Sequence, residues 1–228
     1  MGFPPGTIIV PTSETARYSH FYRSLQGLVT PPGTKTLWSM GSLIAINLNK
    51  AVRDLSGEWV MIWGDDHTFP PDILLSLLAY DVDIVAPLCL DRRSPFQPAV
   101  CVWEESLGMY RRARLSEAPA AGLWEVPVIG MAGAVIKRHV FDVIKPPYFG
   151  HRVVQMGDHE LIEGEDLWFC HKAAEAGFKC HIAVEHTIGH IFAGTVLPVY
   201  QGGQWRTRID SAEGAVLATY DAGREILL

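Results

Sequence analysis

The chain has 228 residues, 48% of them hydrophobic, and its 19 Lys and Arg against 25 Asp and Glu give a formal net charge of −6. This length predicts one domain with a substantial buried core, and the apolar content excludes intrinsic disorder. Four scattered cysteines without a CxxC pair exclude a disulfide-stapled miniprotein and indicate reduced thiols. The mild acidity argues against a protein that coats nucleic acid by charge alone.

No stretch approaches the roughly 18 apolar residues that a membrane span requires. The opening residues, MGFPPG, lack the basic and apolar regions of a secretory signal. We therefore expect a cytoplasmic protein without a membrane span.

The first part of the chain alternates apolar runs of strand type with helical patterns. The predicted elements are a strand at 7–11, a helix from about 12 to 25, a helix at 42–54, a strand at 58–63, a helix after Pro70-Pro71, and a strand at 82–87. Helices between successive strands favour an α/β domain with a largely parallel sheet.

The second part is less regular. Its predicted elements are strands at 98–103, 123–128, 134–136 and 179–184 and a helix at 164–176. The segment after 192 is rich in glycine and isolated aromatic residues, and it is predicted to form a lid or tail.

Polar clusters follow three of the predicted strands. The segment 12–14 follows the first strand, Asp65-Asp66-His67 follows the second, and 186–190 follows the last. Because ligands of open α/β sheets bind beyond the carboxyl ends of the strands, we expect these clusters to lie along one edge.

Asp65, Asp66 and His67 come directly after an apolar strand. Two adjacent carboxylates are costly unless a cation or hydrogen bonds compensate them. Carboxylate oxygens suit Mg²⁺ and Mn²⁺, and Mn²⁺ accepts imidazole more readily. A metal site is therefore favoured, and the alternative is a helix cap next to a solvated histidine.

Glu165 and Asp166 open the predicted helix at 164–176. The positive field of a helix N-terminus keeps carboxylates ionised near neutral pH, and an ionised carboxylate that faces a hydroxyl can act as a general base. From these residues alone, simple complementation of the helix dipole is the preferred interpretation.

Four segments, in this order, resemble the motifs of GT-A-fold glycosyltransferases of the family 2-like kind. They are GDDHTFPP at 64–71, MAGAVIKRHVF at 131–141, GEDLWFC at 164–170 and GHI at 189–191. The resemblance covers about residues 7–192, and it is closest to the small enzymes of this kind that occur in bacteriophages and bacteria.

The resemblance implies a single GT-A (Rossmann-like) α/β domain with a mixed, mostly parallel sheet flanked by helices. This domain would span 1–192, with a nucleotide-sugar half at about 1–90 and an acceptor half at about 91–192. A C-terminal lid or tail at 193–228 would follow.

The resemblance also implies roles for individual residues. The metal ligands would be Asp66, Asp65, His67 and His190. The catalytic residues would be Asp166 as the base and Glu165, which would orient or bind the acceptor. The nucleotide sugar would contact Pro11, Thr12, Glu14, Asp65 and Arg93.

Several of these roles have open alternatives. The residue two positions before Asp66 is Gly64, where a standard DxD motif has an aspartate, so either Asp65 takes that duty or Asp65-x-His67 acts as a DxH variant. Thr12 and Glu14 could simply cap a helix. His190 could be an ordinary histidine at a strand end with His186 as the ligand instead, and Arg93 could lie in a solvated loop.

The function implied is a metal-dependent, inverting glycosyltransferase that uses Mn²⁺ or Mg²⁺ and a nucleoside-diphosphate sugar. Its acceptor hydroxyl could belong to a hydroxymethylated DNA base, a saccharide or a protein. The basic and aromatic segments 110–114 and 205–208 could contact nucleic acid, although most such segments are solvated surfaces. The alternatives are a nucleotidyltransferase, a metal-dependent phosphohydrolase and a non-catalytic sugar-nucleotide or nucleic-acid binding module.

Overall fold

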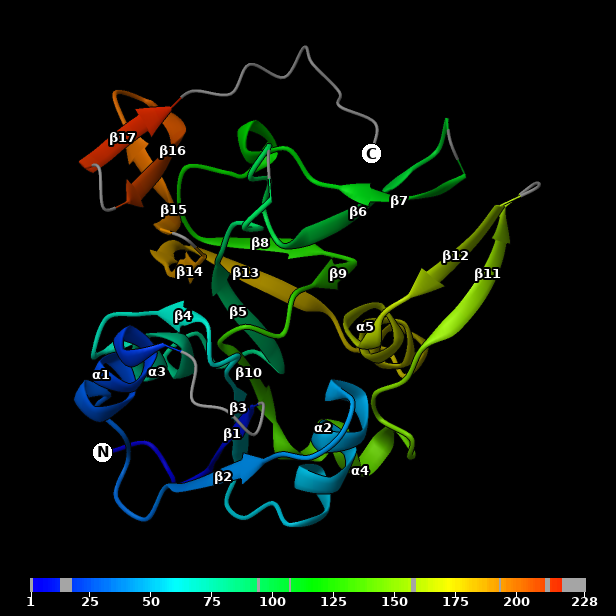
Figure 1. Ribbon diagram of the computed structural model, residues 1–228. Coiled ribbons are helices and arrows are strands. Elements are labelled where there is room, and N and C mark those ends of the chain that lie inside the picture. Colours follow the sequence, from blue (N-terminus) through cyan, green and yellow to red (C-terminus); the bar gives the residue numbers. More distant parts are fainter. Residues whose placement is uncertain are drawn as a thin grey trace.

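The computed structural model describes residues 2–12, 18–93, 95–106, 108–156, 159–192, 194–211 and 214–218. A seven-stranded sheet lies at the centre of the molecule, with helices on both faces (Figure 1). No helix within these described ranges is long and apolar enough to cross a membrane. All four cysteines are buried and unpaired.

The central sheet is mixed, and most of its strands are parallel. Its order is β2 (Lys35–Ser39), β1 (Thr7–Pro11), β3 (Trp59–Ile62), β10 (Ala134–Lys137), β5 (Ile84–Leu88), β13 (Cys180–Thr187) and β8 (Leu123–Val126). Only β10 and β8 run against the other strands of this sheet. The predicted fold class, an α/β domain with a mixed and mostly parallel sheet, is confirmed.

Each face of the sheet carries its own apolar core, because side chains alternate along a buried strand. Along β3, Val60 and Ile62 join one core, while Trp59 and Met61 join the other. The first core is covered by α2 (Ile44–Arg53), α4 (Arg138–Val143) and α5 (Glu165–Glu175), and the second by α1 (Ser19–Gly27) and α3 (Ile73–Leu78) (Figure 1). Both faces of β1, β3 and β5 are therefore buried, which explains their continuous apolar sequences.

A second sheet joins the end of the chain to the loop after β3. Its order is β17 (Gly214–Ala218), β16 (Gln204–Ser211), β15 (Gly194–Gln201), β14 (Gly189–Ile191) and β4 (His67–Thr68). The segment after 192, which the sequence predicted as a lid or tail, thus contributes three strands to the described structure. The pairing of β14 with β4 places His190 opposite His67.

Smaller elements lie between residues 100 and 163, in the part of the chain for which the sequence predicts an acceptor half. They are a sheet of β7 (Met109–Arg112), β6 (Val100–Glu104) and β9 (Val128–Ile129), the 3₁₀ turn η1 (Leu115–Glu117), and a hairpin of β11 (Arg152–Met156) and β12 (His159–Glu163) that projects from the body (Figure 1). The strand predicted at 123–128 is divided at Pro127 between the central sheet and this small sheet. Proline has no backbone N–H to continue a ladder, so the chain changes sheets there.

Candidate active site

The loop after β3 brings Asp66 and His67 together over a glycine. Asp66 Oδ1 lies 2.9 Å from His67 Nδ1, and His67 Nδ1 also lies 3.3 Å from the carbonyl oxygen of Gly64. A Cβ at Gly64 would stand 2.9 Å from Asp66 Oδ1 and 3.1 Å from His67 Nδ1. The departure from a DxD motif at this position therefore has a steric reason, since any side chain there would press on the cluster.

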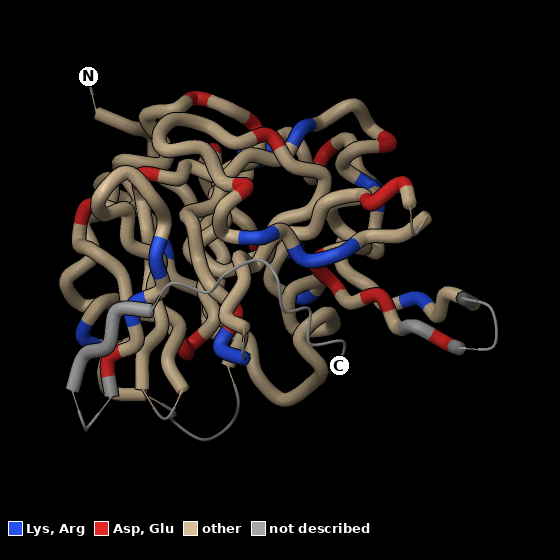
Figure 2. Tube along the Cα trace, turned by 90° about the horizontal axis from the view of Figure 1, so that it is seen from above, with Lys and Arg blue, Asp and Glu red and all other residues tan. Residues whose placement is uncertain are grey.

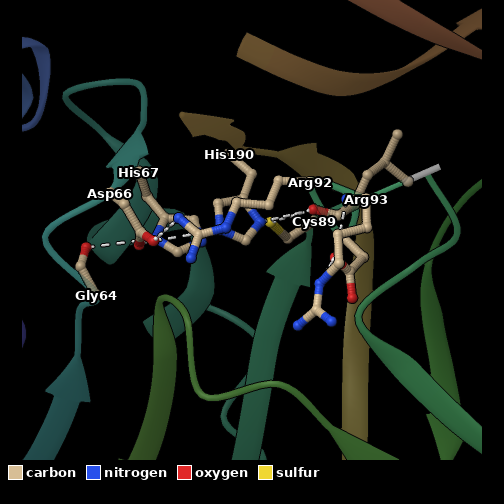
Figure 3. A network of polar contacts seen from close by, with 9 residues as sticks. Gly64, Asp66, His67, Cys89, Arg92, Arg93 and His190 are labelled. Atoms are coloured by element: carbon tan, nitrogen blue, oxygen red, sulfur yellow. Dashed lines mark hydrogen bonds and ion pairs between the residues drawn. The ribbon is translucent and has the colours of Figure 1, made fainter. Parts of the chain in front are cut away.

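His190 completes the cluster from the far end of the chain (Figure 3). Its ring stacks on that of His67 with the centroids 4.4 Å apart and the planes at 24°, and its Nε2 lies 3.4 Å from Asp66 Oδ2. Its other nitrogen, Nδ1, lies 3.0 Å from the carbonyl oxygen of Leu90. Because a carbonyl can only accept, Nδ1 donates to Leu90, and Nε2 faces the carboxylate.

The guanidinium of Arg92 balances the charge of Asp66. Its Nη1 donates to Asp66 Oδ2 at 2.9 Å, and its side chain remains 40% exposed. Arg93, the residue predicted to contact the nucleotide sugar, is 81% exposed, and its Nε lies 4.0 Å from Asp91 Oδ1. The structure thus places Arg92, rather than Arg93, on the cluster.

The surroundings of Asp66 hold it as an anion. Burial alone would raise the pKa of Asp66, but hydrogen bonds with His190 and His67 outweigh burial and hold this pKa well below its usual range. Burial lowers the pKa of His67. The cluster is therefore a fixed carboxylate beside an imidazole that favours its neutral form.

Asp65 points to a different partner from Asp66. It is buried, and its Oδ2 accepts a short hydrogen bond from the hydroxyl of Thr12. Thr12 follows the last residue of β1, Pro11, and its backbone N–H donates to Ser39 at 3.0 Å. Asp65 thus links the ends of β1 and β3, while Glu14 lies outside the described residues.

Cys89 is a member of the cluster that the sequence did not single out. Its Sγ and ligand atoms of His67 and His190 all lie within 4.8 Å of one another. Burial raises the pKa of the Cys89 thiol far above its usual range, so the thiol is protonated. A signal for it was available, because Cys89 directly follows β5 at the same edge of the sheet.

This donor set fits a divalent transition-metal ion. His190 Nε2 and Asp66 Oδ2 lie 3.4 Å apart and share a hydrogen bond, and a metal ion bound by both atoms would take the place of the shared proton. A backbone carbonyl on the other nitrogen of a histidine is the support that metal-binding histidines usually have. Two imidazoles with one carboxylate suit Mn²⁺ better than Mg²⁺.

Glu165 and Asp166 begin α5 at a second polar centre. Glu165 Oε2 lies 3.1 Å from His151 Nε2. Burial, followed by the charge of Glu165, raises the pKa of Asp166 to about 7, against the lowering effects of Arg112 and of the Met131 backbone. The sequence predicted an ionised carboxylate near neutral pH, but burial outweighs the helix field and leaves Asp166 partly protonated there.

A row of charged residues connects the two centres. Arg92 contacts Asp66 at 2.9 Å, and its neighbour Asp91 contacts Arg112 at 3.4 Å. The positive charge of Arg112 in turn lowers the pKa of Asp166. The backbone takes the same course, since Ala99 donates to the carbonyl of Cys89 and Gly130 donates to that of Ala99. The cluster and the Asp166 carboxylate therefore flank one continuous stretch of the sheet edge.

Comparisons with known proteins establish the fold but no family. No family model and no curated protein matches the chain. Among solved structures, A197 from STIV is similar with a TM-score of 0.50 and 14% identity over 96% of each chain. Residues 1–349 of S. aureus TarS, in complex with UDP-GlcNAc, give a TM-score of 0.47 at 13% identity, over 78% of this chain and 55% of that one. The likeness to A197 shows that the two chains share a fold along nearly their whole lengths.

Proposed function

We propose that this protein is a metal-dependent glycosyltransferase that moves a sugar from a nucleoside-diphosphate sugar to an acceptor hydroxyl. The observation that carries the proposal is the cluster of Asp66, His67 and His190 at the carboxyl edge of the central sheet, where ligands of α/β folds bind. Two of the four motifs of the resemblance, at 64–71 and 189–191, supply the residues of this cluster, although they lie far apart in the sequence.

The metal would be held by Asp66, His67 and His190. When bound, a divalent cation there neutralises the charge that develops on a departing nucleoside diphosphate. Arg92 lies on the same carboxylate with its side chain 40% exposed, so it can turn to a diphosphate oxygen. Asp65 and Thr12 would position the nucleoside at the end of β1.

Asp166 is the base in this proposal. A pKa of about 7 lets the carboxylate accept a proton from an acceptor hydroxyl near neutral pH. The sugar carbon passes through a state like that in glycoside hydrolysis, and direct attack by the hydroxyl inverts it. Glu165, held by His151, would orient the acceptor.

The acceptor proposed from the resemblance is a hydroxymethylated DNA base. Such a base has to leave the double helix before its hydroxyl can reach a site of this kind. A saccharide or protein acceptor would use the same metal cluster and the same base.

A thermal-shift screen tests the donor half of the proposal. Nucleoside diphosphates and their sugars are added with and without Mn²⁺, and the matching ligand should raise the Tm by about 5–10 °C at a hundred times its Kd. Asp66→Asn should abolish the shift that depends on Mn²⁺. No shift with any nucleotide would refute the proposal, and pyrophosphate release from a nucleoside triphosphate would favour a nucleotidyltransferase.

A further inference from the structure

A cavity of about 320 Å³ shares none of its lining residues with the candidate active site. Three segments form its walls: the loop at 95–97, the turn around η1, and the hairpin of β15 and β16. The lining residues that matter below are Phe96, Arg114, Tyr200, Trp205 and Arg206. A volume of this size is at the lower end of the range for small-molecule sites.

The charged side chains that line the cavity are positive. Two arginines, Arg114 and Arg206, line it, and none of the described lining residues is acidic. Elsewhere on the trace, Lys and Arg positions are interspersed with Asp and Glu positions (Figure 2). The neighbouring Arg111 is bound by Glu104 and Glu117 at 2.9 and 2.7 Å, and Glu117 also accepts a hydrogen bond from the backbone N–H of Arg114 at 2.7 Å.

Arg206 has an unmet hydrogen bond. Its Nε is shielded from solvent, and no residue that the structure describes accepts a bond from it. A buried guanidinium N–H without an acceptor costs free energy, and an anion in the cavity would remove that cost after a small turn of the side chain. Arg208, two positions along the same strand, instead donates to Asp210 at 2.8 Å.

Aromatic side chains supply further walls of the cavity. Trp205 is held by a hydrogen bond of 3.1 Å from its Nε1 to the carbonyl of Pro119, and Tyr200 packs edge-on against it with the centroids 5.2 Å apart. Phe96 has a φ of +55°, a left-handed conformation that non-glycine residues rarely adopt. Strain of this kind gathers at ligand sites, and rings beside arginines are the surroundings in which nucleotides are bound.

We propose that this cavity is an acceptor subsite that binds one nucleotide unit, with its phosphate on Arg206 and Arg114 and its base against the aromatic walls. The role of this cavity as an acceptor subsite rests on the proposed function, whereas its binding of a nucleotide does not. The loop that holds Phe96 also holds Arg92, since Asp91 N–H donates to the carbonyl of Gln97 at 2.8 Å. The cavity is therefore joined to the Asp66 cluster through one short loop.

Calorimetric titration in EDTA tests the ligand class. The probes are thymidine 5′-monophosphate, thymidine, glucose 6-phosphate and inorganic phosphate, and the nucleotide should bind at least about tenfold more tightly than each of the others. Equal binding of glucose 6-phosphate or thymidine would overturn the nucleotide assignment, because it would leave no role for the rings or for the arginines.

Variants test the location. Arg206→Gln should weaken binding of thymidine 5′-monophosphate at least about tenfold, whereas the control Arg208→Gln should change it less than about twofold. If Arg206→Gln does not fold, Arg114→Gln should show the same direction of change. An unchanged affinity in the arginine variant that folds, or an equal loss in Arg208→Gln, would overturn the proposal.

A last titration separates this subsite from the donor edge. With Mn²⁺ and the donor nucleotide at saturation, thymidine 5′-monophosphate should bind with its affinity unchanged within about twofold. Mutual exclusion of the two ligands would overturn a separate subsite. If no donor nucleotide binds at all, the proposed function fails, while the Arg206 titration still decides whether the cavity binds a nucleotide.

Discussion

Asp66 and Asp166 are the same chemical group in opposite surroundings. Asp66 lies between two imidazoles and a guanidinium, and its pKa is held well below the usual range. Asp166 is partly buried beside Glu165 with Arg112 as its counter-charge, and its pKa is raised to about 7. The difference follows from the partners of each side chain, not from its position at a sheet edge or helix start.

Two carboxylates with pKa values pushed apart can divide the work of one reaction. A carboxylate that never takes up a proton in the physiological range is suited to hold a cation. One that titrates near neutral pH is suited to accept a proton and release it. The following experiments test whether this division is real.

The largest effect is expected for Asp66→Ala. The substitution removes the anion shared by His67, His190 and Arg92, and with it the means of holding a metal ion against the donor. We expect kcat/KM for transfer to fall by at least about 10³-fold, which corresponds to several kcal/mol of transition-state stabilisation. Steady-state assays with Mn²⁺ measure it.

The control for this variant is Asp142→Ala, which removes an exposed carboxylate on α4. It should leave transfer unchanged within about twofold, because surface substitutions far from a site rarely matter. Retained activity in Asp66→Ala with a normal Tm would contradict the assignment of Asp66.

Asp166→Asn should come next in size. The amide keeps the shape of the carboxyl but cannot accept a proton, so kcat should fall by about 10²- to 10⁴-fold. Donor affinity, measured by the Mn²⁺-dependent thermal shift, should stay within about twofold. A parallel loss of donor binding would place Asp166 in the donor site and erase the contrast with Asp66.

The pH dependence sharpens the same contrast. Below a pKa of about 7 the fraction of ionised Asp166 falls tenfold per pH unit, so kcat should rise with pH and level off above that value. Asp66 stays ionised throughout this range and adds no second step. A profile without this rise would show that the base lies elsewhere.

The free energy of unfolding should depend on pH in the opposite direction from kcat. Between about pH 4 and about pH 7 the folded protein keeps a proton on Asp166 that the unfolded chain has lost. The free energy of unfolding should therefore fall as pH rises through this window, because ionising the buried carboxyl destabilises the native state. Denaturant melts of the wild type and Asp166→Asn measure it, and identical slopes in the two proteins would be the contrary result.

Much of the central sheet could be predicted from the sequence. Strands β1, β3 and β5 are buried on both faces, so each is a continuous apolar run that ends in a polar residue or a turn. The residues after β3 were singled out for the same reason. A fully buried strand leaves a sharp boundary in the sequence, and that boundary marks the edge of the sheet.

The rest depended on pairings that no local pattern encodes. β2 is an edge strand with mostly exposed residues. β15 to β17 are consecutive antiparallel strands, and among the described strands only the pairing of β14 with β4 joins this sheet to a segment far away in the chain. The contact of His190 with His67 arises from the register of β14 against β4. The position of Cys89 directly after β5 was a signal, but a lone buried cysteine is also typical of an apolar core, so its residue type did not single it out.

The smallest effect is expected for substitutions at Arg92 and Arg93. Both lie in the loop after β5, but only the guanidinium of Arg92 contacts Asp66, at 2.9 Å, while Arg93 is 81% exposed. Because the Arg92 pair is itself partly exposed, Arg92→Gln should change the free energy of unfolding by no more than about 1 kcal/mol. It should weaken donor binding about five- to tenfold through the lost diphosphate contact.

Arg93→Gln serves as the matched control and should change donor affinity less than about twofold. A larger effect at Arg93 would mean that the loop rearranges when the donor binds, and that the charge balance at Asp66 is set by the ligand instead of by Arg92.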